Sequence, residues 1–184
     1  MNNWPVPNSY SKKIPLCGSP GCFWEDRGDR RHCGIDIYAP FKSPILSIDD
    51  GLIIKTGIFT SPEKVKYWNE TNYIIVKDRD GFYIKYAELS EISVNEKQYV
   101  RAGQVIGFVG TVLNNKKIKD NSPIYIRDLK RKKNLNMLHF ELYKIKPFMS
   151  DRYLGGNWFG KNKPKNLLNP ETKFSKNKDD KIKD

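Results

Sequence analysis

The chain has 184 residues, of which 38% are hydrophobic and 12% aromatic, so it is long enough to bury a core and fits one globular domain. Lysine and arginine number 33 against 21 aspartates and glutamates, which gives a formal net charge of +12. This charge attracts anionic partners over a long range, and nucleic acid, acidic lipid and the anionic polymers of a bacterial wall all qualify.

The first residues, MNNWPVPNSYSKKIPL, contain no apolar run of the roughly seven residues that an export signal needs. No stretch of the chain approaches the roughly 20 apolar residues of a membrane span. We therefore expect a soluble protein without a signal peptide. It would be cytoplasmic as written, or extracellular or in the cell wall if it is exported or released by another route.

Short apolar or alternating runs follow one another along the chain, and each is typical of a β-strand. In chain order they are GIDIYAP (34–40), SPILSI (43–48), LIIKTGIF (52–59), NYIIVKD (72–78), FYIKYAELS (82–90), YVRAGQVIGFVGTV (99–112) and MLHFELYK (137–144). The turns DDG and RDG between runs indicate hairpins, because glycine supplies a positive φ. We find no amphipathic helix of useful length. The pattern predicts antiparallel sheets that close over one core.

Two charged segments depart from this pattern. Residues 114–136, NNKKIKDNSPIYIRDLKRKKNLN, carry eight Lys or Arg against two Asp, a net charge of +6. An irregular connection of this length inside a compact domain is usually functional or mobile. Residues 171–184 are charged and nearly free of apolar side chains, so we expect a disordered tail.

Three cysteines, Cys17, Cys22 and Cys33, lie in the first fifth of the chain. An odd number cannot pair fully within one chain, which leaves one disulfide with a free thiol, or three thiols. A separate zinc knuckle with Cys17 and Cys22 would take His32 away from a site shared with Asp36. A Cys17–Cys22 disulfide or plain thiols are therefore favoured. Cys33 is expected to face away from His32, because neighbouring side chains alternate along a strand.

The chain has only two histidines, His32 and His139. His32 and Asp36 have the spacing H-x-x-x-D, which places both side chains on one face of an extended strand if the chain bends slightly at Gly34. Zinc that takes part in chemistry needs about three protein ligands and an open position for water. The spacing alone is weak evidence, since a histidine beside a turn is more often a solvated or capping residue. His139 lies in an apolar run, where a packed core histidine is the alternative.

Several motifs in a fixed order resemble those of the lysostaphin-type zinc endopeptidases, which cut peptide bridges in bacterial peptidoglycan. The family pattern runs H-x-G-x-D-I-x-A-P, a D-G hairpin, Y-x-H-L-S, V-x-x-G-Q-x-I-G-x-x-G and H-L-H-F-E. This chain contains HCGIDIYAP, IDDG, YAELS, VRAGQVIGFVG and MLHFE. The resemblance covers about residues 4 to 148, with a gap for the basic segment. It implies an all-β fold, an antiparallel β-sandwich with a groove that holds zinc.

The resemblance also implies a division of the chain and a set of zinc ligands. A lead-in would span 1–22 and the peptidase domain 23–170, with the basic segment 114–136 as an insert and the charged tail after it. The zinc ligands would be His32, Asp36 and His139.

Two histidines of the family are replaced in this chain. Glu88 stands in YAELS where the family has a catalytic histidine, and Met137 stands at the first histidine of H-x-H. In the family these histidines orient the water and stabilise the charged intermediate. Methionine has no proton to give, and its sulfur is a weak acceptor. Tyr83 or Tyr86 could offer a hydroxyl to a substrate groove, although packing is the ordinary role of tyrosines on strands.

The role of Glu88 has two possible interpretations. Glutamate can act as a general base beside zinc, and it could equally become a fourth ligand that closes the site and makes the metal structural. The first reading predicts a zinc metallopeptidase that hydrolyses peptide bonds in peptidoglycan cross-bridges or stem peptides. The alternative is a catalytically degenerate module that keeps zinc and groove and binds or regulates cell-wall hydrolysis.

The basic insert is expected to attract an anionic wall polymer to the groove. Nucleic acid is disfavoured as a partner, because Tyr125 is the insert's only aromatic residue and stacking on bases needs several.

Overall fold

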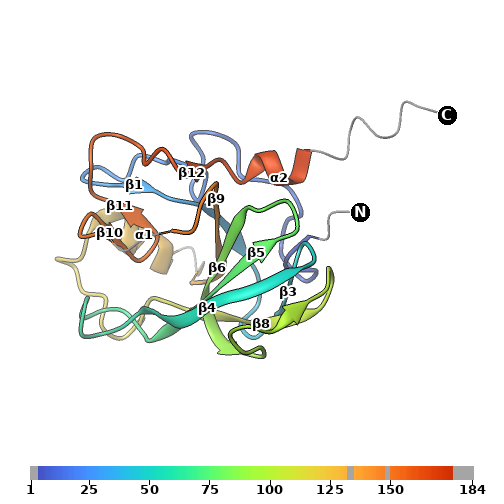
Figure 1. Ribbon diagram of the computed structural model, residues 1–184. Coiled ribbons are helices and arrows are strands. Elements are labelled where there is room, and N and C mark those ends of the chain that lie inside the picture. The colour runs from blue at the N-terminus through green and yellow to red at the C-terminus, as the bar shows by residue number, and fades with distance from the viewer. Residues whose placement is uncertain (1–3, 132–134, 148–149, 176–184) are drawn as a thin grey trace.

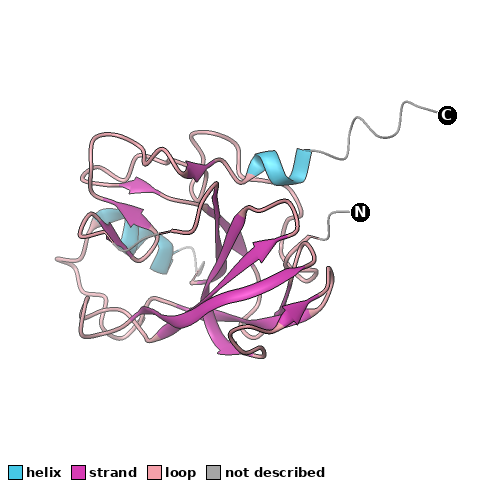
Figure 2. Cartoon of the chain, viewed as in Figure 1, coloured by secondary structure: helices cyan, strands magenta, loops and turns pink. Residues whose placement is uncertain are grey.

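The computed structural model describes residues 4–131, 135–147 and 150–175 (Figure 1). Strands dominate, and the helices are short (Figure 2). The strands are β1 (Arg31–His32), β2 (Ile35–Tyr38), β3 (Pro44–Leu46), β4 (Gly51–Thr60), β5 (Thr71–Asp78), β6 (Tyr83–Ile92), β7 (Tyr99–Val100), β8 (Val105–Thr111), β9 (Asn136–Tyr143), β10 (Tyr153–Leu154), β11 (Asn157–Trp158) and β12 (Leu167–Leu168). The helices are α1 (Ile124–Arg131) and α2 (Glu171–Ser175). Neither helix is long and apolar enough to cross a membrane, and the described ranges contain no other.

Two antiparallel sheets form the fold. The main sheet has the order β12–β9–β8–β6–β5–β4–β7, and β2 and β3 join it by pairing with β9 and β8. A smaller sheet has the order β1–β11–β10. The main sheet curls instead of lying flat, because β9 pairs with β2 and β12 and also with β6 and β8. The prediction of an all-β antiparallel fold is confirmed.

The hydrophobic core lies inside the curl of the main sheet. Its largest cluster takes side chains from β2, β3, β4, β5, β6, β8 and β9, such as Ile37, Ile74 and Leu138. The central strands β6 and β9 are buried along most of their length, so both faces of the sheet are covered there. Val6 from the N-terminal lead-in is fully buried in the same cluster. The lead-in is therefore part of the domain's packing.

The two glycine turns predicted as hairpins have different outcomes. RDG joins β5 to β6, which pair with each other, and Gly81 has a φ of 87°. DDG does not close a hairpin, because β3 pairs with β8 while β4 pairs with β5 and β7. Gly51 serves a close approach instead: a Cβ there would lie 2.6 Å from the Lys77 carbonyl oxygen of the neighbouring strand.

The basic insert 114–136 is only partly irregular, which corrects the prediction. Helix α1 lies within it, and Ile126 and Leu129 pack in a small cluster with Trp68 and Ile118. Two apolar positions one turn apart among charged neighbours give a weak signal in the sequence. The helix is stabilised by packing against residues distant in the chain rather than by its own pattern.

The tail is also more ordered than predicted, because its first five residues form α2. Phe174 packs on Trp4 and Phe140, with ring centroids 5.2 and 5.4 Å apart. Residues 176–184 lie outside the described residues. Lys173, in the middle of α2, is buried with 4% of its surface exposed.

The Lys173 ammonium joins α2 to the main sheet through three carboxylates. Its Nζ lies 2.5 Å from Asp78 Oδ2 and 3.2 Å from an oxygen of Asp49 and of Asp80. Lys173→Ala should therefore lower the free energy of unfolding by about 3 kcal/mol, because it leaves the buried Asp78 without its cation. Urea denaturation measures this. Lys165→Ala, on an exposed lysine, is the control and should change stability by less than about 0.5 kcal/mol. Equal effects of the two changes would contradict the assignment.

Candidate metal centre

The three residues of the predicted metal site come together at the junction of the two sheets. Strand β2 pairs with β9 in a register that sets Asp36 directly opposite His139. His32 arrives from β1 of the small sheet. The chain passes between the sheets at Gly34, where a Cβ would lie 2.3 Å from the Phe140 carbonyl oxygen. Only glycine fits there, and the bend that the sequence required at this position is present.

Three donor atoms form a near-equilateral triangle. His32 Nε2 lies 3.0 Å from Asp36 Oδ1 and 3.0 Å from His139 Nδ1. His139 Nδ1 lies 3.0 Å from Asp36 Oδ1. All three side chains are buried. Within the described residues, these three form a group whose ligand atoms all lie within 4.8 Å of one another.

The outer nitrogen of each ring is held by an acceptor. His32 Nδ1–H donates to the Cys22 carbonyl oxygen at 2.8 Å, and His139 Nε2–H donates to Glu141 Oε1 at 2.9 Å. Each ring therefore turns its other nitrogen toward Asp36. Two imidazole nitrogens and one carboxylate oxygen, with the rings fixed from behind, match the donor set of zinc sites.

Arg27 and Glu141 complete the centre, and sequence reasoning missed both. Arg27 Nη2 donates to Asp36 Oδ2 at 3.0 Å, and its Nη1 donates to Asn157 Oδ1 at 3.2 Å. Glu141 follows His139 by two residues and therefore points to the same face of β9, a signal that the sequence did contain. Nothing in the sequence around Arg27 indicated its role.

Charges in the centre set the protonation states. Burial lowers the pKa of His32 more than Asp36 raises it. Burial alone would raise the pKa of Asp36, but the charges of His32 and Arg27 and hydrogen bonds from both rings hold it well below its usual range. Burial also opposes a charge on His139, yet hydrogen bonds to Asp36 and Glu141 raise its pKa to about 9. Asp36 is therefore ionised, which is the form that binds metal, whereas each ring binds metal only after the nitrogen that faces Asp36 has lost its proton.

Glu88 lies on β6, beside the centre. The residue before it, Ala87, pairs with His139 of β9. It has a φ of 66°, a left-handed conformation that is rare outside glycine. Burial raises the pKa of Glu88 to about 8, helped by the charge of Asp36 and opposed by those of His139 and Arg27. Its Oε2 is buried and has no hydrogen-bond partner among the described residues.

Met137 is buried on the same face of β9 as His139, two residues before it. The prediction that Tyr86 lines a groove is wrong: Tyr86 is fully buried in the core, and its hydroxyl accepts a hydrogen bond from the Ile48 N–H. Tyr83 is half-buried, its ring lies under the Lys77 ammonium, and it packs beside the cluster around Tyr143. Tyr86 therefore takes the packing role, while the groove role of Tyr83 stays a prediction.

All three cysteines are free thiols, with Cys17 exposed and Cys22 and Cys33 buried. Cys33 packs with Tyr143 and Leu167, away from the three donor atoms, as the strand alternation predicted.

A hairpin covers one side of the centre. The turn between β10 and β11 contains Gly155 and Gly156, both with positive φ. A Cβ on Gly156 would lie 2.6 Å from His139 Nε2, so the hairpin backbone rests directly on that ring. Phe59 stacks on the same ring with centroids 5.7 Å apart.

A cleft of about 820 Å³ begins on the other side, at Gly21 and Arg27, which both contact Asp36. Ile124 and Leu129 of α1 line it as well, so the basic insert contributes a wall of the approach to the centre.

Glu141 is fully buried and accepts hydrogen bonds from Tyr143 and Tyr153, in addition to a 2.9 Å ion pair with Lys85. Glu141→Gln should lower the free energy of unfolding by about 3–5 kcal/mol, because the buried Lys85 ammonium loses its counter-charge. The double variant Lys85→Met, Glu141→Gln should lose less than Glu141→Gln alone, since no unpaired ammonium remains. Denaturant unfolding of the two variants and Lys85→Met measures the coupling; simple additivity would contradict it.

Two solved structures have a similar fold. The catalytic domain of the antimicrobial peptidase lysostaphin from Staphylococcus simulans aligns with a TM-score of 0.52 at 19% identity, covering 84% of this chain and 88% of that one. The catalytic domain of the prophage-encoded M23 protein EnpA from Enterococcus faecalis, solved as a mutant, aligns with a TM-score of 0.50 at 21% identity, covering 85% and 94%.

Two proteins are similar in sequence. The cell division protein DipM of Caulobacter vibrioides is 34% identical over 98 residues, 47% of this chain and 15% of that protein. The DD-carboxypeptidase/endopeptidase Mpg of Neisseria meningitidis is 38% identical over 82 residues, 45% of this chain and 17% of that protein. The chain thus spans less than a fifth of the length of either relative.

The sequence profile of Peptidase family M23 matches residues 30–150, more than half of the chain and all three donor residues. The resemblance drawn from the motifs is confirmed, and the chain belongs to peptidase family M23.

Proposed function

We propose that the chain binds one zinc ion through His32, Asp36 and His139 and hydrolyses peptide bonds in peptidoglycan cross-bridges or stem peptides, with Glu88 as the general base. The observation that carries the proposal is the triangle of three donor atoms with the Glu88 carboxyl beside it but outside it. Three protein ligands with an open fourth position are typical of catalytic zinc, whereas structural zinc has four.

A bound zinc ion would lower the pKa of a water molecule and polarise a peptide carbonyl. The residues of the chain would hold the reacting groups. Arg27 fixes Asp36 through one carboxylate oxygen, so that the other faces the two histidines. Glu141 and the Cys22 carbonyl fix the rings from behind. Preformed geometry of this kind lowers the cost of assembling the site.

Glu88 has the properties of a base rather than of a fourth ligand. Its oxygens lie outside the set of ligand atoms within 4.8 Å of one another. Its Oε2 has no hydrogen-bond partner among the described residues. A carboxyl whose pKa is raised to about 8 by burial is matched to proton transfer near neutral pH.

Met137 is expected to weaken catalysis at the proposed site, because it offers no hydrogen-bond donor where the resemblance expects a histidine. Losing one donor that stabilises an oxyanion commonly lowers kcat by about 100- to 1000-fold. We therefore expect slow turnover.

The substrate proposal is supported by the names of the similar proteins, which include a cell division protein, a DD-carboxypeptidase/endopeptidase and an antimicrobial peptidase. Wall polymers are anionic, and the chain's net charge of +12 favours association with them. The cleft beside Asp36 has room for a peptide, and the basic insert supplies one of its walls.

One observation favours a second candidate, a degenerate zinc-binding module that binds or regulates cell-wall hydrolysis. The three donor residues, Glu88 and Met137 are all buried, so a substrate reaches them only if the surrounding loops move.

The zinc proposal predicts one zinc ion per chain after dialysis against metal-free buffer. Asp36→Asn and His139→Ala should each reduce zinc affinity by at least about 10- to 100-fold, because each removes or weakens one of three ligands. Elemental analysis and competition with a chromogenic chelator measure it. Asp120→Asn, on an exposed loop, is the control. Full zinc content in both ligand variants would refute the assignment.

The base proposal predicts that Glu88→Gln lowers peptidoglycan cleavage by at least about 100-fold while zinc content stays at one per chain. Glu91→Gln, an exposed glutamate on the same strand, should leave both unchanged. Release of soluble fragments from purified peptidoglycan measures cleavage. Loss of zinc in Glu88→Gln would instead make Glu88 a ligand.

Restoring the two family histidines separates the candidates. If Glu88→His with Met137→His converts an inert protein into an active one, the natural chain is the degenerate module. If wild type already cleaves, the peptidase proposal stands.

A further inference from the structure

A second cavity, of about 250 Å³, lies between the main sheet and the β10–β11 hairpin. It adjoins the candidate metal centre on the side of His139. Phe59 lines the cavity and also stacks on the His139 ring. Gly155 lines it too, while the next residue, Gly156, rests on His139. One hairpin therefore forms a wall of the cavity and the cover of the metal centre.

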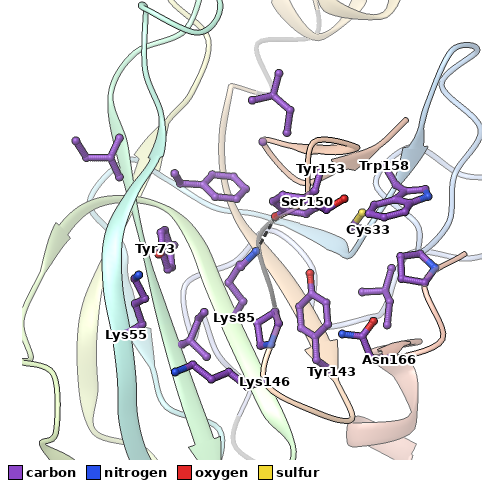
Figure 3. A pocket seen from close by; sticks show the side chains of 18 of the residues that line it. Cys33, Lys55, Tyr73, Lys85, Tyr143, Lys146, Ser150, Tyr153, Trp158 and Asn166 are labelled. Carbon is purple, nitrogen blue, oxygen red and sulfur yellow. Dashed lines mark hydrogen bonds between the residues drawn. The ribbon is translucent and has the colours of Figure 1, made fainter. Parts of the chain in front are cut away.

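Aromatic rings and lysines share the lining of this cavity, which we call the lysine pocket. Its four lysines are Lys55, Lys64, Lys85 and Lys146. Figure 3 shows the Lys85 side chain between Tyr73 on one side and Tyr143 and Tyr153 on the other. The Lys85 ammonium lies 4.2 Å from the centroid of the Tyr153 ring and 5.6 and 5.8 Å from those of Tyr143 and Tyr73.

The lysine pocket carries an excess of positive charge. Among the described residues that line it, none is acidic. Lys85 is buried and paired with Glu141 behind the pocket. Lys55, Lys64 and Lys146 are exposed at the rim, and no ion pair of these three occurs within the described part of the chain. Three unpaired ammonium groups around an aromatic-lined cavity attract an anionic group and give apolar atoms a surface to pack on.

We propose that the lysine pocket binds a carboxylate of the peptide substrate, with the side chain that neighbours the carboxylate packed on the aromatic rings. The inference rests on the proposed function, since it takes the ligand to be the peptide that the metal centre would cut. The carboxylate can come from the end of a peptide or from an acidic side chain. A carboxylate held there would lie on the His139 side of the centre, across the β10–β11 hairpin from it.

Isothermal titration calorimetry on the full chain tests the proposal with three matched probes: acetyl-Leu-Ala with a free carboxyl end, its C-terminal amide, and acetyl-Leu-Glu amide. Titrations are made after removal of metal with EDTA and again with one equivalent of zinc. At least one of the two acids should bind about tenfold more tightly than the neutral amide, and its affinity should fall as salt is added, because rim charges are screened. The tighter acid identifies the source of the carboxylate.

The double variant Lys55→Gln, Lys146→Gln should weaken binding of that acid by about tenfold. Lys66→Gln with Lys116→Gln, two exposed lysines outside the pocket lining, is the control and should bind like wild type. Equal binding of acids and amide would overturn the proposal, as would wild-type affinity in the pocket variant.

The metal-free titration keeps the two proposals separate. Binding that needs zinc would place the carboxylate on the metal and overturn the pocket. Metal-free binding that depends on Lys55 and Lys146 supports the pocket even if the protein cleaves nothing, in which case only the proposed hydrolysis fails.

Discussion

The register of β2 on β9 is the constraint on which the candidate site depends. It sets Asp36 opposite His139, and the same alternation buries Ile35 and Ile37 in the core. A slip of one residue would turn Asp36 into the core and its apolar neighbours toward His139, which the loss of apolar burial opposes. The free energy that folds the sheet therefore also fixes two of the three donor atoms. The third, on His32, depends on the passage between the sheets at Gly34.

Charges of alternating sign run through the centre from the half-buried Arg27 to four buried groups, Asp36, His139, Glu141 and Lys85. Each charge has an opposite neighbour, which offsets its loss of hydration, and removing one leaves the next uncompensated. The ends of this series reach different cavities. Arg27 lines the cleft walled by α1, and Lys85 lines the lysine pocket. The centre therefore lies electrostatically between two surfaces that a ligand can reach.

Local pattern was enough to predict the strands and their antiparallel class, because alternation is a short-range property. The set of His32, Asp36 and His139 was predicted only from the resemblance to the family. Pairing between distant segments was not predictable in the same way. The DDG turn has the local pattern of a hairpin, and nothing local indicates that β3 pairs with β8 instead of with β4. Helix α1 and Lys173 depend on partners far away in the chain, Trp68 for the helix and Asp78 for the lysine. Glu141 was missed as well, but it could have been found from local pattern. It follows His139 by two residues, and alternation puts both side chains on the same face of the strand.

Glu88, the proposed base, has an unusual backbone conformation as well as an unusual side-chain environment. Its left-handed conformation lies where β6 shifts register against β5, since Glu88 falls between the paired residues Ala87 and Leu89. A Cβ on Gly110 would lie 2.5 Å from the Glu88 carbonyl oxygen. A non-glycine residue keeps such a conformation only where the surrounding structure enforces it, and such strain gathers at functional sites. Packing gives no reason to bury a carboxyl without a hydrogen-bond partner for Oε2 among the described residues. Backbone strain and an unpaired buried oxygen therefore occur together at Glu88, next to the three donor atoms. This coincidence favours a role for the Glu88 carboxyl in the centre.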